Sequence, residues 1–107
     1  MRFEINGVQW KIEFVPAGSP FLRRSDGSVT LGMCDADKCS VYLLKSLRGA
    51  YMRRVLAHEL VHCFMFSYSI DISLEEEEFI ADWVATYGSD LVYLLDDILR
   101  MILKGAA

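Results

Sequence analysis

Two histidines with a glutamate between them are the residues of this chain whose types and spacing best suit chemistry. His58 and His62 stand four positions apart in an apolar stretch, and Glu59 directly follows the first of them. Residues four apart share one face of an α-helix, so both imidazoles can bind the same tetrahedral Zn²⁺ ion. The carboxylate of Glu59 can then act as a general base toward a water molecule at the metal.

The residues around this motif favour the same interpretation. Catalytic motifs of this form prefer uncharged or apolar neighbours at four positions, and this chain has Val55, Leu60, Val61 and Phe64 there. One alternative is a core helix whose two histidines are satisfied by hydrogen bonds, and another is a metal-free helical domain with a chance motif. Burying two imidazoles and a carboxylate is costly unless they are paired or hold a metal, which favours metal binding.

A second helix is expected to supply the third protein ligand that tetrahedral zinc needs beside a water. Ser73 and Glu76 form a capping-box pattern at the start of a run of four glutamates. Acidic residues in a first helical turn also suit the helix dipole, so most of this run needs no further role.

Glu78 is the preferred third ligand. Ala81, Asp82 and Ala85 follow it at helical spacing, and this stripe of small residues would let the second helix approach the first closely. Asp82, one turn after Glu78, can accept a hydrogen bond from the outer nitrogen of a ligating histidine.

Two other glutamates stay open as the third ligand. A slip of one residue rotates a helix by about 100°, so Glu77 is the main alternative and Glu75 the next. No group for stabilising a transition-state oxyanion can be identified, because both histidines are assigned to the metal. Tyr51 and Tyr68 are open alternatives for that role.

The combined motif, His-Glu-x-x-His followed by Glu-x-x-x-Asp, resembles the gluzincin group of zinc metallopeptidases. The ending Glu-x-x-Ala-Asp-x-Val-Ala is similar to that of ImmA/IrrE-type metallopeptidases and their small phage and bacterial relatives, although Val61 stands where that family usually has glycine. The resemblance covers residues 55–85. It implies a zinc-dependent endopeptidase in which His58, His62 and Glu78 bind Zn²⁺ and Asp82 supports a histidine.

The resemblance also implies a protein or peptide substrate, of which a repressor protein is one example. In the related enzymes an extended peptide adds itself to a strand beside the zinc helix. The strand at residues 40–44, directly before the helix that carries His58 and His62, is one candidate for such an edge strand here. The alternative from another class is a non-catalytic, zinc-containing protein-interaction module of phage or prophage origin.

Length and composition indicate a single domain spanning residues 1–107. The chain is 53% hydrophobic and carries a formal net charge of −4, which argues against nucleic acid as a direct partner. We expect no signal peptide and no membrane association, and hence a cytoplasmic protein. The oligomeric state is left open.

Turn signals divide the domain into a β-rich part, 1–45, and a helical part, 46–107. Asn6-Gly7 predicts a hairpin. The expected strands are 1–5, 8–15, 28–34 and 40–44. Ser46 is expected to cap a helix over 47–67, followed by a helix over 74–87 and, if Gly88-Ser89 breaks the path, a last helix to about 104. The fold class is therefore α+β, a small antiparallel sheet followed by three helices.

The three cysteines give no sign of a second metal site. Cys34 and Cys39 could face each other across a hairpin, but the chain has no further Cys or His pair to complete a closed site. Cys63 lies about 140° around the helix from His58 and is expected to pack in the core.

Overall fold

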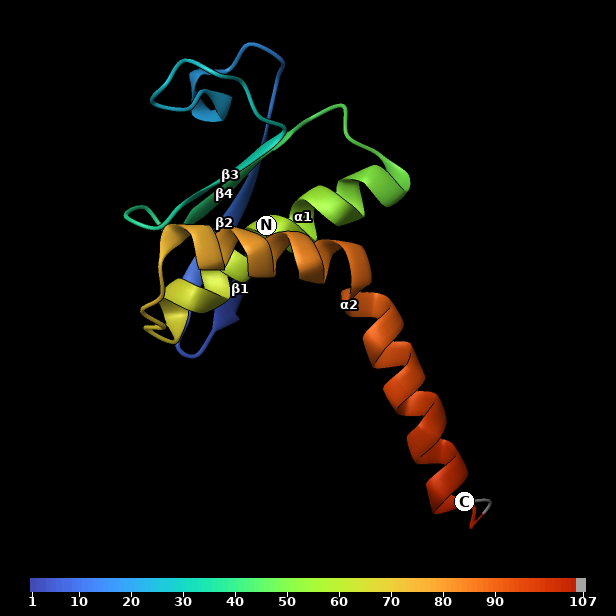
Figure 1. The fold of residues 1–107 in the computed structure, drawn as a ribbon. Coiled ribbons are helices and arrows are strands. Elements are labelled where there is room, and N and C mark those ends of the chain that lie inside the picture. Colours follow the sequence, from blue (N-terminus) through green and yellow to red (C-terminus); the bar gives the residue numbers. More distant parts are fainter. Residues whose placement is uncertain (106–107) are drawn as a thin grey trace.

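A computed structural model describes residues 1–105 and shows a four-stranded sheet followed by two long helices (Figure 1). The α+β class is confirmed. In chain order the elements are β1 (Arg2–Ile5), β2 (Val8–Val15), the short 3₁₀ helix η1 (Pro20–Leu22), β3 (Gly32–Asp35), β4 (Ser40–Leu44), α1 (Gly49–Ser67) and α2 (Leu74–Leu103).

The sheet has the strand order β1-β2-β4-β3 and is mixed. Strands β1 and β2 form the predicted hairpin, where Asn6 and Gly7 both take the positive φ angles that a tight two-residue turn requires. Strands β3 and β4 are also antiparallel, but β2 and β4 run parallel. The prediction of an antiparallel sheet was therefore wrong for its central pair.

Strand β4 lies in the middle of the sheet because its side chains are apolar on both faces. Residues 40–43 are all buried, and the strand pairs with β2 on one side and β3 on the other. A continuous apolar run of this kind is typical of a central strand covered on both faces. The prediction that residues 40–44 form an edge strand was wrong, and the strand at that edge is β3.

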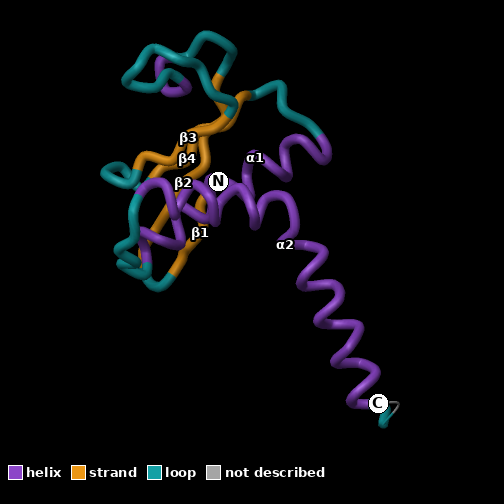
Figure 2. Tube along the Cα trace, viewed as in Figure 1, coloured by secondary structure: helices purple, strands orange, loops and turns teal. Residues whose placement is uncertain are grey.

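Helix α1 lies along one face of the sheet (Figure 2), and the buried core residues come from these two elements. Trp10 of β2, Val41 and Leu43 of β4 and Cys63 of α1 are almost completely buried there. Cys63 is thus a core residue, as expected. On the other face of the sheet Leu22 of η1 covers a smaller cluster.

Helix α1 begins later than the sequence predicts. Leu47 is buried and its backbone N–H donates to the carbonyl of Leu44, so the chain is still turning at that point. Arg48 is the N-cap residue in place of Ser46, and Gly49 is the first helical residue. The third strand also starts later than predicted, at Gly32 and not at residue 28.

Helix α2 begins at the predicted capping box, in which Ser73 and Glu76 hydrogen-bond each other reciprocally. Gly88-Ser89 does not end it, so the prediction of three helices was wrong. Gly88 keeps a negative φ, and no proline follows to remove a backbone donor, so the hydrogen-bonded ladder continues. Figure 1 shows that the path bends near this point and that the second half of α2 leaves the body of the protein.

Within residues 1–105, none of the helices combines the length and the apolar character that crossing a membrane would require.

Candidate metal centre

Three predicted ligands converge where α1 and α2 pack together. Nε2 of His58 lies 3.1 Å from one carboxylate oxygen of Glu78, and Nε2 of His62 lies 3.0 Å from the other. The two Nε2 atoms are 3.3 Å apart. These three side chains form a group that could hold a metal ion.

The distances within this group fit zinc. With Zn–N and Zn–O bonds of about 2.0–2.2 Å, the ligand atoms of a tetrahedral site lie roughly 3.3 Å from one another. Among the residues that the structure describes, no fourth His, Cys, Asp or Glu joins the group. Three protein ligands with one position left for water or substrate are typical of catalytic zinc sites, whereas structural sites have four protein ligands.

The outer nitrogen of each histidine contacts a carboxylate from α2. Nδ1 of His58 lies 2.9 Å from Asp82, the residue predicted to support a histidine, and Nδ1 of His62 contacts Glu77. When Nδ1–H donates to a carboxylate, the neutral ring presents a lone pair at Nε2. Three electron-rich groups then face one another, an arrangement that a bound cation would stabilise.

The sequence left both Glu78 and Glu77 open as the third ligand. In the structure both reach the centre, from different sides. Glu78 lies between the Nε2 atoms of the histidines, and Glu77 contacts the outer nitrogen of His62. They can do so because residues that are adjacent on a helix point about 100° apart. Glu75 is exposed in the first turn. The role of Glu77 beside His62 was missed, because spacing does not show which of two adjacent glutamates meets which ring nitrogen.

Glu59 is buried, with 8% of its surface exposed. Burial raises the pKa of its carboxyl group above the ordinary value, and the charge of nearby Glu78 acts in the same direction, while His58 and His62 oppose the shift. A carboxylate with a raised pKa holds a proton more readily than an ordinary glutamate, a property that suits a group passing protons near neutral pH.

Gly32 brings β3 unusually close to α1 beside Glu59. A Cβ atom added at Gly32 would lie 2.7 Å from Cγ1 of Val55, 3.2 Å from Cγ of Glu59 and 3.2 Å from Cδ2 of Leu43. A larger residue at this position would require the Val55 side chain, or the helix that carries it, to shift. The absence of a side chain at Gly32 thus helps to set the position of Glu59 relative to the edge strand.

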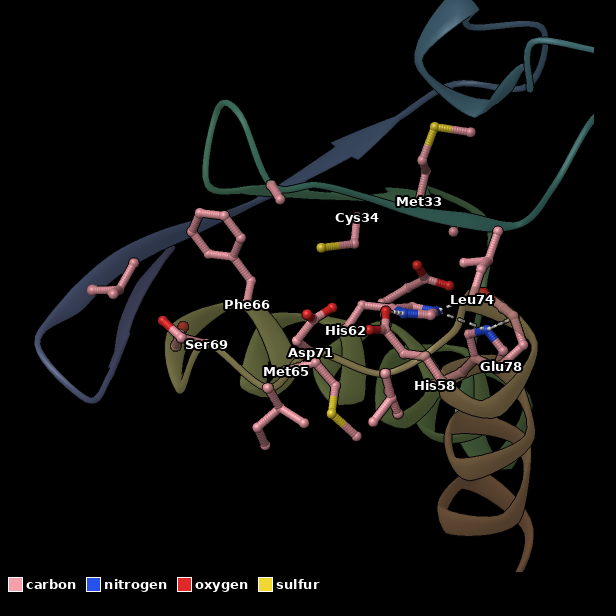
Figure 3. Close-up of a pocket in the computed structure, with 18 of the residues that line it drawn as sticks. Met33, Cys34, His58, His62, Met65, Phe66, Ser69, Asp71, Leu74 and Glu78 are labelled. Atoms are coloured by element: carbon pink, nitrogen blue, oxygen red, sulfur yellow. Dashed lines mark hydrogen bonds and ion pairs between the residues drawn. The ribbon is translucent and has the colours of Figure 1, made fainter.

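A cavity of about 1140 Å³ opens beside the candidate ligands. Figure 3 shows His58, His62 and Glu78 together at one end, with Met33 and Cys34 on the side of the sheet. Residues from the end of α1 and the loop after it line a further part of the cavity, and four of these seven are apolar: Met65, Phe66, Ser67, Ser69, Ile70, Asp71 and Ile72.

Cys34 lines this cavity but is a poor metal ligand or nucleophile. Its Sγ atom lies 3.8 Å from that of Cys63. This contact and burial raise the pKa of the Cys34 thiol far above its ordinary value. The reactive form of cysteine is the thiolate, which is disfavoured here.

Arg24 was not identified from the sequence as a candidate for the site. It lines the main cavity and a second, smaller one, and Glu59 lines both as well. Its positive charge acts to lower the pKa of Glu59. The turn that carries Arg24 is closed by a backbone hydrogen bond from Arg24 to Ser28. No sequence pattern links this loop to a motif more than thirty residues away.

The fold and the site together define an α+β protein with a three-ligand candidate metal centre next to a buried glutamate. Comparisons with protein-family models, with curated proteins and with solved structures gave no match. The resemblance to zinc metallopeptidases therefore stays a prediction.

Proposed function

We propose that this protein is a zinc-dependent endopeptidase. The observation that carries the proposal is the position of Glu59, a buried carboxylate beside the group formed by His58, His62 and Glu78, at the wall of an open cavity. A site that only stabilises the fold has no need of an uncoordinated acidic group there, because burial of such a group is unfavourable.

His58, His62 and Glu78 would hold the zinc ion, which when bound lowers the pKa of a water molecule and polarises a carbonyl group. Asp82 and Glu77 orient the two rings by accepting their Nδ1 protons. Glu59 removes a proton from the attacking water and then delivers it to the nitrogen of the departing amine, so that the carboxyl group ends the cycle as it began.

The substrate would bind as an extended peptide along β3. This strand lies at the edge of the sheet, it pairs with β4 on one side, and Gly32, Met33 and Cys34 line the cavity. An unpaired strand edge offers backbone donors and acceptors at the spacing of an added strand. The corrected strand order supports this proposal, since it places an edge next to the candidate zinc centre, although a different edge from the one predicted.

Arg24 is the candidate for stabilising the negative charge that develops on the carbonyl oxygen during attack. It lines both cavities that Glu59 lines, and a guanidinium is a strong donor that stays charged. Tyr51 lines only the smaller cavity, and Tyr68 lines neither.

The test uses a mixture of fluorogenic peptides and the Glu59→Gln variant. Glutamine keeps the shape of glutamate but cannot accept the proton, so we expect hydrolysis to fall by about 10²–10⁴-fold while one zinc ion per chain is retained. Glu75→Gln, the same change at an exposed position, should leave both activity and zinc content unaltered. Undiminished hydrolysis by Glu59→Gln would overturn the mechanism.

The alternative, a non-catalytic zinc-containing interaction module, predicts a different result. It requires the wild-type protein to bind zinc and to hydrolyse no peptide in the mixture. Two observations argue against this alternative: the described residues offer only three protein ligands, and Glu59 is buried beside them.

A further inference from the structure

The second half of α2 packs against nothing in the described part of the chain. Every residue from Asp90 to Leu103 is exposed, whereas Ala81, earlier in the same helix, is completely buried. Figure 1 shows this segment extending away from the sheet and from α1. An isolated helix of about 14 residues is only marginally stable in water, so tertiary or quaternary contacts are expected to support it.

The segment has the composition of a helix that buries one face against a partner, although that face is exposed in the structure. Eight large apolar side chains occupy one half of its circumference at about 100° per residue, and each is between 40% and 58% exposed. They are Leu91, Val92, Leu94, Leu95, Ile98, Leu99, Met101 and Ile102. The opposite half carries Tyr93, Leu103 and all the charged residues: Asp90, Asp96, Asp97, Arg100 and Lys104. An exposed apolar face of this size on a helix marks an interaction surface.

We propose that this apolar face is the interface of a homodimer in which the second half of α2 packs antiparallel against the same segment of a second copy. Leu91, Leu95, Ile98 and Ile102 follow the four-three-four spacing of a helix-pairing seam. With Leu95 and Ile98 at the two-fold axis, Leu91 of one copy lies opposite Ile102 of the other. The apolar face of each copy then covers the same face of the other copy, as a two-fold interface requires.

The charges on the segment favour this occupant and this orientation. Asp90 lies at the end nearer the body, Asp96 and Asp97 lie in the middle of the segment, and the two basic residues, Arg100 and Lys104, lie toward the far end. In this register an antiparallel pair brings Lys104 of one helix level with Ser89 of the other, next to Asp90, whereas a parallel pair in register would align every charge with its like. Arg100 is paired with Asp97 of its own helix, and Asp96 and Asp97 lie on the polar half of the helix, which faces away from the seam. A membrane surface is a poorer fit, because helices that lie on anionic lipid carry mainly Lys and Arg on the polar face.

The size of the apolar face fits a weak, concentration-dependent dimer. A large aliphatic side chain carries about 60–120 Å² of apolar surface. Eight of them, about half exposed, present roughly 240–480 Å² per copy, which is less than the roughly 800 Å² per partner of a standard interface and falls in the range of weaker, transient interfaces. Because the segment projects from the body, a second helix can lie along it without meeting α1.

The first experiment is analytical ultracentrifugation of the full chain across a range of concentrations. We expect a species of twice 12.2 kDa at micromolar concentrations. In Leu95→Glu two carboxylates would meet at the two-fold axis, so the dissociation constant should rise by about 100-fold or more. Tyr93→Glu adds the same charge on the polar half of the helix and should leave the dimer intact.

Loss of the dimer through general unfolding is excluded by a second readout. Leu95 is exposed and lies beyond the part of α2 that reaches the metal centre, so zinc content should be the same in all three proteins. The monomeric Leu95→Glu variant should also lose helical circular dichroism, because the segment is then unsupported.

Three results would overturn the proposal. They are a wild-type protein that stays monomeric at hundreds of micromolar, a dimer that survives Leu95→Glu, and a monomer that cosediments with lipid vesicles. Orientation is tested by disulfide crosslinking of a mixture of Leu91→Cys and Ile102→Cys. Antiparallel helices give the mixed product, and parallel helices give each variant crosslinked to itself, which would contradict the arrangement.

Discussion

The four consecutive glutamates at the start of α2 allow the geometry of the candidate zinc centre to be tested within a single turn of helix. Glu75, Glu77 and Glu78 are replaced one at a time by glutamine. Each substitution removes one negative charge and keeps the side-chain size, so helix propensity and long-range electrostatics change to a similar extent. Differences in zinc affinity among the three variants then report what each carboxylate contacts.

The contacts in the structure set the expected magnitudes. Both oxygens of Glu78 face the Nε2 atoms of the histidines, so Glu78→Gln removes a ligand. Glu77 contacts only the outer nitrogen of His62, and loss of such a supporting carboxylate lowers metal affinity by about 10–100-fold, or roughly 1.4–2.8 kcal/mol. Glu78→Gln should therefore exceed 100-fold, Glu77→Gln should fall within that range, and Glu75→Gln should match the wild type.

The assay is competition for zinc with a chromogenic chelator at fixed pH, supported by circular dichroism to show that each variant is folded. The order of affinities decides the result. A larger loss in Glu77→Gln than in Glu78→Gln would refute the assignment of the third ligand. Equal losses in all three variants would mean that only the net charge matters.

Three further predictions concern the surroundings of the base. Gly32→Ala should destabilise the protein by about 1–3 kcal/mol and reduce peptide hydrolysis, because the new Cβ lies 2.7 Å from Val55 and presses on Glu59; urea unfolding and activity measure both effects. Glu59→Gln should stabilise the metal-free protein above pH 7. The pKa of the Glu59 carboxyl group is raised in the folded state, so its contribution to folding stability is fully present below the ordinary pKa and is lost as pH rises through the raised value. Glutamine has no such proton to lose and avoids this loss. Arg24→Gln should lower kcat by about 10²–10³-fold with zinc content unchanged, which steady-state kinetics and metal analysis test together.

Matched controls make these predictions decisive. Adding Val55→Ala to Gly32→Ala makes room for the new methyl group and should restore activity in part; no recovery would contradict the steric explanation. A Glu59→Gln variant that is less stable than the wild type at pH 8 would contradict the cost assigned to burial. Arg23→Gln alters the neighbouring exposed arginine, and an equal loss of activity there would remove the specific role of Arg24.

Local patterns predicted those features whose causes are local. The Asn6-Gly7 turn and the capping box at Ser73 and Glu76 depend on residues within three positions of each other, and both were found where expected. The predictions that depend on distant partners were less successful. From the sequence, residues 40–44 were predicted to form an edge strand because they directly precede the helix that carries His58 and His62. In the structure this strand, β4, is buried on both faces and lies in the centre of the sheet.

What the sequence determined by itself is the set of side chains able to bind a metal, since the four-residue spacing on one helix and the acidic start of the next follow from helical periodicity alone. Only the tertiary structure decided how they are used. The packing of α1 against α2 places Glu78 between the histidines and Glu77 outside them, the close approach at Gly32 sets β3 beside Glu59, and a loop brings Arg24 to the same cavity. These relations depend on contacts between residues far apart in the chain, which no local pattern encodes.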